Sequence, residues 1–247
     1  MDLREFFEAH PKVALAFSGG VDSSYLLYAA RECGADVHAY FVSGAFQPEF
    51  EKADARRLAE QVGAALTVLP VDVLAHPEVV ENPQNRCYFC KRAVFSTIVK
   101  AAAQDGYEVL MDGTNASDDV ADRPGMRALA ELKVRSPLRE AGLTKARIRE
   151  LSHEAGLFTW DKPSYACLAT RIPTGEPITQ DKLSTTEWAE GYLMGLGLSD
   201  FRVRWFNGAA KIQVPAAQMP TVLEHRAEIL STLGQRYTAV LLDLEAR

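Results

Sequence analysis

The sequence has none of the long apolar stretches of a membrane protein. Its longest apolar runs, such as residues 13–17 and 239–242, are far shorter than the roughly 20 residues that a membrane-spanning helix needs. Residues 1–10 are acidic and amphipathic and lack the apolar core of a secretion signal. Cysteine is also scarce, and the four cysteines of a cytoplasmic enzyme are more often reduced, catalytic or metal-binding than disulfide-bonded. These absences favour a cytoplasmic protein with no membrane partner.

The chain also lacks an excess of positive charge. Its 33 acidic residues outnumber its 27 lysines and arginines, which gives a formal net charge of −6. A broad nucleic-acid surface normally needs a basic face, so we expect no nucleic-acid partner. The 47% of hydrophobic residues and 24% of charged residues are typical of a folded chain. The length of 247 residues suits one large or two modest domains.

A glycine turn lies between a predicted strand and a predicted helix. Its residues are Ser18, Gly19, Gly20, Val21, Asp22 and Ser23. The glycines let the backbone approach an anion, and free amides and the helix dipole then face that anion. The serine hydroxyls add donors, and Asp22 can hold Mg²⁺ beside phosphates. The lysine of a Walker A loop is missing, so this is a phosphate loop of another type or a strand–turn–helix corner without a ligand.

The N-terminal half alternates predicted strands and helices. The strands are 13–17, 37–42, 65–71 and 108–111, and the helices are 23–33, 51–62 and 91–104. This alternation predicts an α/β fold with a parallel, doubly wound sheet covered on both faces. Ligands of such sheets bind at the carboxyl ends of the strands. The candidate nucleotide contacts at those ends, besides the loop, are Val42, Asp112, Gly113 and Thr114.

The C-terminal part has a different pattern. Thr144 is a candidate N-cap for a helix that ends near residue 155, and its three basic residues favour a solvated face. An irregular stretch at 157–178 contains Cys167, and long loops are often functional. Predicted elements then follow at 179–194 (helix), 201–206 and 211–214 (strands around the Asn207–Gly208 turn), 220–233 (helix) and 237–242 (strand). We predict domains at 1–165 and 166–247, the second a small antiparallel α+β domain.

Three cysteines form a candidate metal or sulfur site. Cys87 and Cys90 form a C-x-x-C just before the helix predicted from residue 91, and Cys167 lies in the long loop. A redox pair, a zinc site completed by His76, an iron–sulfur cluster with one open iron, and a pair without ligand are all compatible with this spacing. Cys33 lies among apolar helix residues and is expected to be a buried apolar side chain.

Several stretches resemble one known family. Residues 18–23 resemble the pyrophosphate loop of the PP-loop superfamily (N-type ATP pyrophosphatases), which includes GMP synthetase, asparagine synthetase and tRNA thiolases. Nearly the whole chain is similar to the ATP-dependent sulfur transferases that help to build the nickel-pincer nucleotide cofactor of lactate racemase. The matching stretches are 18–23, 82–83, 86–91, 112–115, 118–119, 123–125, 136–138, 160–163, 166–173 and 202–204. Residues 210–213 depart from the family pattern, which puts substrate contacts there in doubt.

The resemblance implies a two-step reaction. ATP adenylylates a carboxylate of pyridinium-3,5-biscarboxylic acid mononucleotide, and sulfur then displaces AMP to give a thiocarboxylate. One branch of the family takes sulfur from its own cysteine, matched by Cys167, and is left with dehydroalanine. The branch with three cysteines holds a 4Fe-4S cluster that delivers sulfide, and this chain resembles that branch. A sulfide or a sulfur-donor protein would recharge the site, and relatives assemble as hexamers.

The resemblance also suggests roles for individual residues. The candidate catalytic residues are Cys167, Asp22, Arg171 and Glu190; the cluster ligands are Cys87, Cys90 and Cys167; and the Mg²⁺ ligands are Asp22 and Asp112. Arg202 and Arg204 alternate along a strand, so both point to one face and suit a substrate phosphate. Two alternatives stay open: a tRNA thiolase with the same loop and three cysteines, and a metal-stabilised ATP-binding module without turnover.

Overall fold

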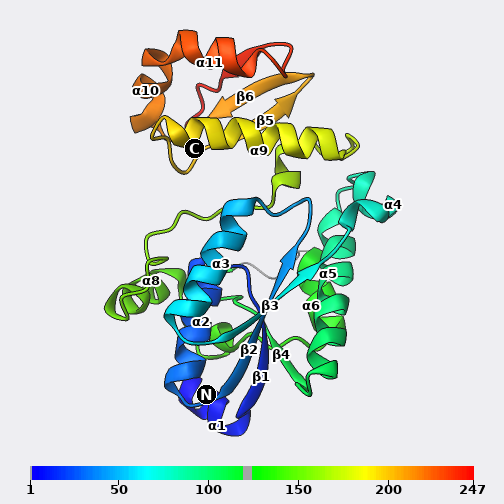
Figure 1. The fold of residues 1–247 in the computed structure, drawn as a ribbon, viewed down its shortest axis with the longest axis vertical. Helices are drawn as coiled ribbons and strands as arrows, with labels where there is room; N and C mark the ends of the chain where they lie inside the picture. Colours follow the sequence, from blue (N-terminus) through cyan, green and yellow to red (C-terminus); the bar gives the residue numbers. More distant parts are fainter. Residues whose placement is uncertain (1, 119–123) are drawn as a thin grey trace. The chain divides into compact units, whose positions relative to one another are not determined.

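The computed structural model describes residues 2–118 and 124–247 (Figure 1). Within it the chain divides into two compact units. The first runs up to Val73 and from Asn85 to Lys162, and the second holds Leu74–Gln84 and Pro163–Arg247. The predicted domain limits of 1–165 and 166–247 stay a prediction, and they did not include the excursion of 74–84 into the second unit. Asp119 and Arg123, parts of two family-like stretches, lie outside the described residues.

The first unit is built on a parallel sheet, as predicted. The strands are β1 (Lys12–Ala16), β2 (Asp36–Ser43), β3 (Ala65–Pro70) and β4 (Val109–Met111), in the order β3-β2-β1-β4. Each neighbouring pair is parallel; Leu15, for example, pairs with Ala39 on one side and Met111 on the other. Because the order reverses at β1, the crevice at the carboxyl ends of β1 and β4 is the expected ligand site of this fold.

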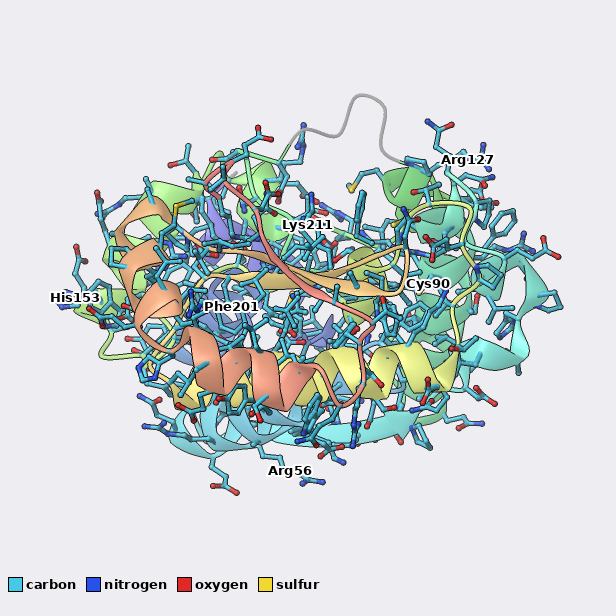
Figure 2. The ribbon with its side chains drawn as sticks, turned by 90° about the horizontal axis from the view of Figure 1, so that it is seen from above. Arg56, Cys90, Arg127, His153, Phe201 and Lys211 are labelled. Carbon is cyan, nitrogen blue, oxygen red and sulfur yellow. The ribbon has the colours of Figure 1, made fainter. Side chains whose placement is uncertain are left out.

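Helices cover both faces of this sheet, and each face has its own core. The covering helices are α2 (Val21–Glu32), α3 (Glu49–Gln61) and α8 (Lys145–Glu154) on one face, and α5 (Arg86–Gln104) and α6 (Pro124–Glu131) on the other (Figure 1). Strand residues alternate between the faces, so Val13 and Leu15 pack with α2 while Ala14 packs with α5. Polar side chains such as Arg56, Arg127 and His153 lie on the outer sides of the helices (Figure 2).

Several elements of the first unit differ from the sequence-based predictions. Helix α5 begins at Arg86 instead of residue 91, so the C-x-x-C lies inside its first turns. Three helices were not predicted: α1 (Leu3–Ala9), α6 and α7 (Pro137–Glu140). Helix α1 begins with a capping box, in which Asp2 and Glu5 each accept from the other's backbone amide. Helix α8 begins after Thr144, whose side chain accepts from the Arg147 amide as predicted.

The second unit contains a three-stranded sheet and its helices. The elements are α4 (Pro77–Val80), η2 (Leu168–Arg171), α9 (Gln180–Gly195), β5 (Arg202–Phe206), β6 (Ala209–Gln213), η3 (Ala216–Gln218), α10 (Met219–Glu224), α11 (Arg226–Leu233) and β7 (Val240–Leu242). Asn207 and Gly208 both have positive φ angles and close the predicted hairpin between β5 and β6. Strand β7 pairs parallel to β6, so the sheet is mixed instead of wholly antiparallel as expected.

Two further features of this part of the chain were not expected. The helix predicted at 220–233 is two helices that meet at His225. The segment 74–84 joins the second unit through backbone hydrogen bonds, from Ile178 to the Val80 carbonyl at 2.8 Å and from Gly175 to the Asn82 carbonyl at 2.9 Å. Among the described residues, no helix is both long enough and apolar enough to cross a membrane.

Candidate functional site

The phosphate loop joins the end of β1 to the start of α2. Gly20 is the N-cap of α2, and Gly19 has a φ of 72°, a left-handed conformation that glycine adopts without strain. Ser18 and Ser23 close the loop, with their hydroxyl oxygens 3.1 Å apart. A side chain at Gly19 would lie 3.3 Å from the Glu51 carbonyl oxygen, so α3 packs closely against the loop. The first amides of α2 therefore stand at a compact turn that suits an anion.

The turn after β4 lies directly against this loop. A Cβ atom at Gly113 would come within 2.9 Å of the Ser23 amide nitrogen, so only glycine fits this contact. Asp112 holds the turn, because its carboxylate accepts from the Thr114 amide at 3.2 Å, the Thr114 hydroxyl at 2.6 Å and the Ser136 hydroxyl at 2.7 Å. The structure thus brings together two of the segments predicted to touch one nucleotide: the phosphate loop and the turn that contains Gly113 and Thr114.

Two predicted contacts at this edge of the sheet are less direct. The Val42 side chain packs in the core between the sheet and α5. The Asp112 oxygens already accept hydrogen bonds from the turn, which makes Asp112 a less available Mg²⁺ ligand than the sequence indicates. The roles of Val42 in nucleotide binding and of Asp112 in metal binding stay predictions.

Asp22 has a carboxylate oxygen suited to a cation. Its Oδ2 accepts from the Lys145 ammonium at 2.6 Å, while its buried Oδ1 has no hydrogen-bond partner among the described residues. Burial raises the pKa of the Asp22 carboxyl above its ordinary value of 3.8, although Lys145 acts in the opposite direction. An oxygen of this kind is the hard donor that Mg²⁺ prefers, so Asp22 fits the predicted metal.

Helix α8 and the segment after it bring basic residues to the loop, which the sequence did not reveal. Lys145 and Arg149 lie four positions apart and so share one face of α8. Arg149 donates to the carbonyls of Trp160 at 2.6 Å and Lys162 at 2.8 Å. Lys162 in turn donates to the Gly19 carbonyl at 3.3 Å and pairs with Asp54 at 2.7 Å. The four-residue spacing of Lys145 and Arg149 is the sequence feature from which this basic face of α8 could have been predicted.

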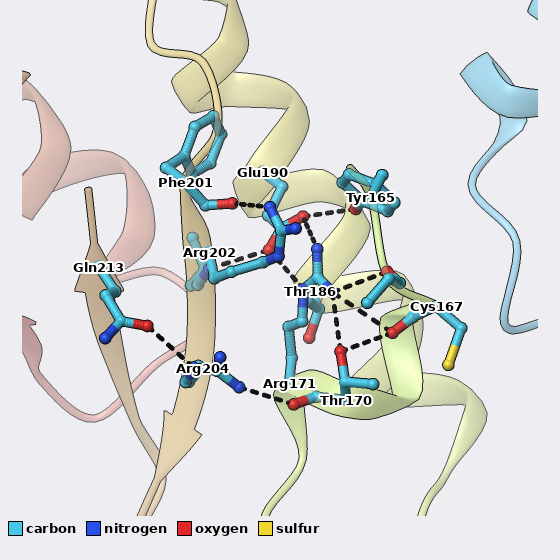
Figure 3. Close-up of polar contacts among 12 residues, drawn as sticks. Tyr165, Cys167, Thr170, Arg171, Thr186, Glu190, Phe201, Arg202, Arg204 and Gln213 are labelled. Carbon is cyan, nitrogen blue, oxygen red and sulfur yellow. Dashed lines mark hydrogen bonds and ion pairs between the residues drawn. The ribbon is translucent and has the colours of Figure 1, made fainter. Parts of the chain in front are cut away.

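The second unit contains a buried polar cluster around Glu190 (Figure 3). Glu190 on α9 pairs with Arg171, with Nε to Oε1 at 2.9 Å and Nη2 to Oε2 at 3.1 Å. The Val203 amide also donates to Oε1 at 2.9 Å, and the Tyr165 hydroxyl donates to Oε2. The side chains of Arg171 and Glu190 are 0% and 1% exposed. Because a buried ion pair needs all its hydrogen bonds, this cluster has one well-defined arrangement.

Arg202 and Arg204 lie beside this cluster on β5 (Figure 3). Arg202 is buried and donates to the carbonyls of Phe201 and Ser164, both at 2.6 Å. Half-buried Arg204 donates to the Thr170 carbonyl at 2.9 Å and to Gln213 at 3.2 Å. Burial, and next the charge of Arg171, lower the pKa of Arg202 to about 10 and also lower that of Arg204. The positive charge concentrated here would be stabilised by an anion.

The predicted sulfur site is divided between the two units. Cys87 and Cys90 lie three positions apart on α5, and Cys167 precedes η2 in the second unit. Cys87 is exposed, and Cys90 and Cys167 are half-buried. No group of three or more His, Cys, Asp or Glu side chains among the described residues is placed to hold a metal ion. The described chain thus offers a two-cysteine motif, and the three-cysteine cluster stays a prediction.

Comparisons with known proteins agree with this geometry. The family model described as asparagine synthase matches residues 4–165. The chain is 38% identical over 250 residues to an uncharacterised protein of Synechocystis, covering 99% of this chain and 92% of that protein. It is 34% identical over 240 residues to the pyridinium-3,5-bisthiocarboxylic acid mononucleotide synthase of Lactiplantibacillus plantarum, covering 94% of this chain and 86% of the synthase.

A more distant similarity covers part of the chain. It is 25% identical over 176 residues to the tRNA-specific 2-thiouridylase of Pseudothermotoga lettingae, which covers 61% of this chain and 49% of that enzyme. The phosphate loop at the head of α2, the parallel sheet that carries it and the extent of the matches lead to one conclusion. The chain belongs to the PP-loop family that the asparagine synthase model describes, and within it to the family of the pyridinium-3,5-bisthiocarboxylic acid mononucleotide synthase.

Proposed function

We propose that this protein is an ATP-dependent sulfur transferase for the nickel-pincer nucleotide cofactor of lactate racemase. Its substrate would be pyridinium-3,5-biscarboxylic acid mononucleotide, of which it adenylylates a carboxylate and converts it to a thiocarboxylate. The observation that carries this proposal is the 34% identity to the mononucleotide synthase over 94% of the chain. The phosphate loop in the first unit and the arginine cluster in the second support it.

The first step would activate the substrate with ATP. A carboxylate oxygen attacks the α-phosphorus, the bond from that phosphorus to the bridging oxygen breaks, and pyrophosphate leaves with the electron pair. The loop amides at the head of α2 would neutralise the developing charge, with Lys145 and Lys162 nearby. Asp22 would hold Mg²⁺, which supplies further charge neutralisation when bound.

The second step would deliver sulfur. A nucleophilic sulfur attacks the acyl carbon, the carbon–oxygen bond to AMP breaks, and AMP leaves. Cys167, whose side chain is half-buried, is the candidate in the second unit. We propose that Cys87, Cys90 and Cys167 would hold a 4Fe-4S cluster, which would supply sulfide as the nucleophile. The alternative is the sulfur of Cys167 itself; its Cβ–Sγ bond would then break with loss of the Cα proton and leave dehydroalanine.

The substrate phosphate would bind at the arginine pair. Arg204 is the better ligand, because its side chain is half-buried, whereas that of Arg202 is buried. Burial, and next the charge of Arg171, lower the pKa of Arg202, and a bound anion would compensate this buried positive charge. Arg202 would then contribute to phosphate binding mainly through its charge.

The test is a coupled assay of pyrophosphate and product. Pyrophosphate release should require the carboxylated pyridinium mononucleotide, and mass spectrometry should find oxygen replaced by sulfur in the product. ATP binding without substrate-dependent pyrophosphate would contradict the proposal and favour a binding module without turnover. Arg204→Met should raise the KM for the mononucleotide and leave the KM for ATP unchanged.

A separate experiment tests the source of sulfur. Anaerobic purification followed by iron and sulfide analysis should find a cluster in the wild type, and less iron in Cys87→Ser and Cys167→Ser alike. A colourless protein with stoichiometric zinc would rule the cluster out. Loss of the elements of H₂S from Cys167 after turnover would instead assign the chain to the self-sacrificing branch.

A tRNA thiolase is the second candidate. The 25% identity to a tRNA-specific 2-thiouridylase favours it, but that match covers only 61% of the chain. The net charge of −6 offers no broad basic surface for tRNA. Pyrophosphate release that depends on tRNA instead of the mononucleotide would reverse our preference.

A further inference from the structure

The segment that carries Cys167 is held at both of its ends by one buried carboxylate. Tyr165 and Arg171, which lie on either side of Cys167 in the sequence, both donate to Glu190. Glu190 also accepts from the Val203 amide at 2.9 Å, which joins α9 to β5. This carboxylate therefore connects the 165–171 segment to the rigid elements of the second unit.

Contacts within residues 165–171 further fix the conformation of this segment. Arg171 Nη1 donates to the Ala166 carbonyl at 2.7 Å, the Thr170 hydroxyl at 2.8 Å and the Cys167 carbonyl at 3.4 Å. The Thr170 hydroxyl donates to the Cys167 carbonyl at 2.9 Å. The Arg171 guanidinium also lies over the Tyr165 ring, 4.5 Å from its centre. The backbone around Cys167 is therefore fixed from several sides.

The sulfur atom is on the other side of this arrangement. Figure 3 shows the Cys167 side chain directed away from Arg171, Arg202 and Arg204. The Cys167 carbonyl, in contrast, faces Arg171 and Thr170. The Arg171 side chain is 0% exposed, so it does not reach a substrate from this position. Arg171 and Glu190 thus lack the access that a catalytic residue needs.

We propose that Tyr165, Arg171 and Glu190 are positioning residues that clamp the Cys167 segment and present its thiol in one place. This role replaces the direct catalytic roles expected for Arg171 and Glu190 and assigns a function to Tyr165. The importance of Cys167 in turnover rests on the proposed function, but the clamp itself does not. Its physical basis is that a buried carboxylate with several donors holds one geometry, and loss of a donor releases it.

The first test measures the reactivity of Cys167 without ATP or substrate. Loss of a hydrogen bond to a buried charged group changes an equilibrium constant by a factor of about ten or more. We therefore expect iodoacetamide to alkylate Cys167 about tenfold faster in Tyr165→Phe than in the wild type, as followed by peptide mass spectrometry. Arg171→Lys keeps the charge but loses the planar fork, and should give a similar increase.

Tyr192→Phe is the matched control. It removes a phenol hydroxyl from α9, the helix that carries Glu190, and the polar neighbours of that hydroxyl, Thr232 and Glu228, lie on α11 and not in the Cys167 segment. Its alkylation rate should equal that of the wild type. Equal rates in Tyr165→Phe and Tyr192→Phe, in variants that melt at the same temperature as the wild type, would overturn the clamp.

The second test separates positioning from substrate contact during turnover. Because the clamp acts on Cys167, Tyr165→Phe should leave the KM for ATP and the first release of pyrophosphate unchanged. It should lower the rate of thiocarboxylate formation, so that more pyrophosphate is released per product. A raised KM for the mononucleotide with unchanged alkylation would show that these residues contact substrate. If the wild type makes no thiocarboxylate, the proposed function fails and the alkylation result still decides the clamp.

Discussion

Two acidic side chains with buried carboxylate oxygens, Glu190 and Asp22, differ in how completely those oxygens are hydrogen-bonded. Glu190 is 1% exposed and accepts hydrogen bonds from two side chains and a backbone amide. Asp22 has Lys145 on one oxygen, while the other is buried without a hydrogen-bond partner among the described residues. Burying a carboxylate without its full set of partners costs stability, so such residues are found mainly at functional sites. Asp22 is thus the residue at which stability and function should conflict.

Asp22→Asn should therefore stabilise the fold while it abolishes turnover. The amide removes the buried charge, and its oxygen can still accept from Lys145. We expect a higher free energy of unfolding by urea at pH 7. We also expect a loss of kcat/KM for ATP of about a hundredfold or more, because under the proposed function Asp22 would ligate Mg²⁺ directly, and even residues that only support metal ligands matter by up to about that factor. Asp161→Asn, which changes an exposed carboxylate, should alter neither quantity.

The pH dependence of this stabilisation has a definite sign. Burial raises the pKa of Asp22 above 3.8 in the folded state, so the folded protein holds this proton more tightly than the unfolded chain. Stability is then lost as pH rises from about 4 through the folded pKa. The advantage of Asp22→Asn should be greatest at neutral pH and vanish near pH 4. An advantage that grows on acidification would contradict this assignment.

Gly113→Ala tests the contact between the β4 turn and the phosphate loop. The added methyl would lie 2.9 Å from the Ser23 nitrogen, so the turn and the loop must separate. Overpacking of this kind costs about 1–3 kcal/mol of stability, and we expect a raised KM for ATP as well. Gly195→Ala on α9, where the added methyl meets no atom within 4 Å, is the control. An unchanged KM for ATP in Gly113→Ala would show that this turn does not contribute to nucleotide binding.

At the scale of elements, α8 supports the phosphate loop from outside the loop sequence. Lys145 in its first turn reaches Asp22, and Arg149 one turn later holds the backbone that carries Lys162 to the Gly19 carbonyl. Arg147 points instead to Glu150 and Glu154 on the exposed side. Helix α8, which is ten residues long, thus places Lys145 beside the phosphate loop directly and Lys162 there through Arg149. The loop itself contains no lysine.

Replacing Arg149 should loosen this support without touching the loop. Arg149→Met loses hydrogen bonds to the carbonyls of Trp160 and Lys162, so Lys162 is held less firmly. We expect the KM for ATP to rise about tenfold with a smaller change in kcat, since a hydrogen bond from a charged group is worth about that factor. Arg147→Met on the exposed side should change neither. Equal effects of Arg149→Met and Arg147→Met would show that the KM for ATP depends on the total charge of α8 and not on the hydrogen bonds of Arg149.

Elements governed by local rules were predictable from the sequence, and those governed by tertiary contacts were not. The parallel strands follow from apolar runs between helices, the Thr144 cap from a side chain that accepts a backbone amide, and the hairpin from Asn207–Gly208. Strand β7 is only three residues long and its direction depends on pairing with β6, which no local pattern encodes. The same holds for the Glu190 cluster, whose members lie up to 38 positions apart.

At the scale of the whole molecule, the chain crosses between its units in a way that periodicity does not reveal. The segment 74–84 leaves the first unit and is held in the second by Asn82, whose amide donates to the carbonyls of Pro173 at 2.8 Å and Glu176 at 3.1 Å. A buried asparagine with a positive φ gives no sequence pattern that distinguishes it from an ordinary turn residue. The phosphate loop was predictable from its sequence motif, but this crossing of the chain was not.

The charge distribution of the whole molecule gives a last prediction, which separates the two candidate functions. Several basic side chains near the described sites are already paired, as in Lys145–Asp22 at 2.6 Å, Lys162–Asp54 at 2.7 Å and Arg171–Glu190 at 2.9 Å. With a net charge of −6, the chain as a whole repels a polynucleotide, which opposes the binding and counterion release that a basic surface would give. We expect no gel shift of tRNA even at low salt, and no inhibition by tRNA of mononucleotide-dependent pyrophosphate release. Tight tRNA binding that weakens steeply with added salt would instead favour the thiolase.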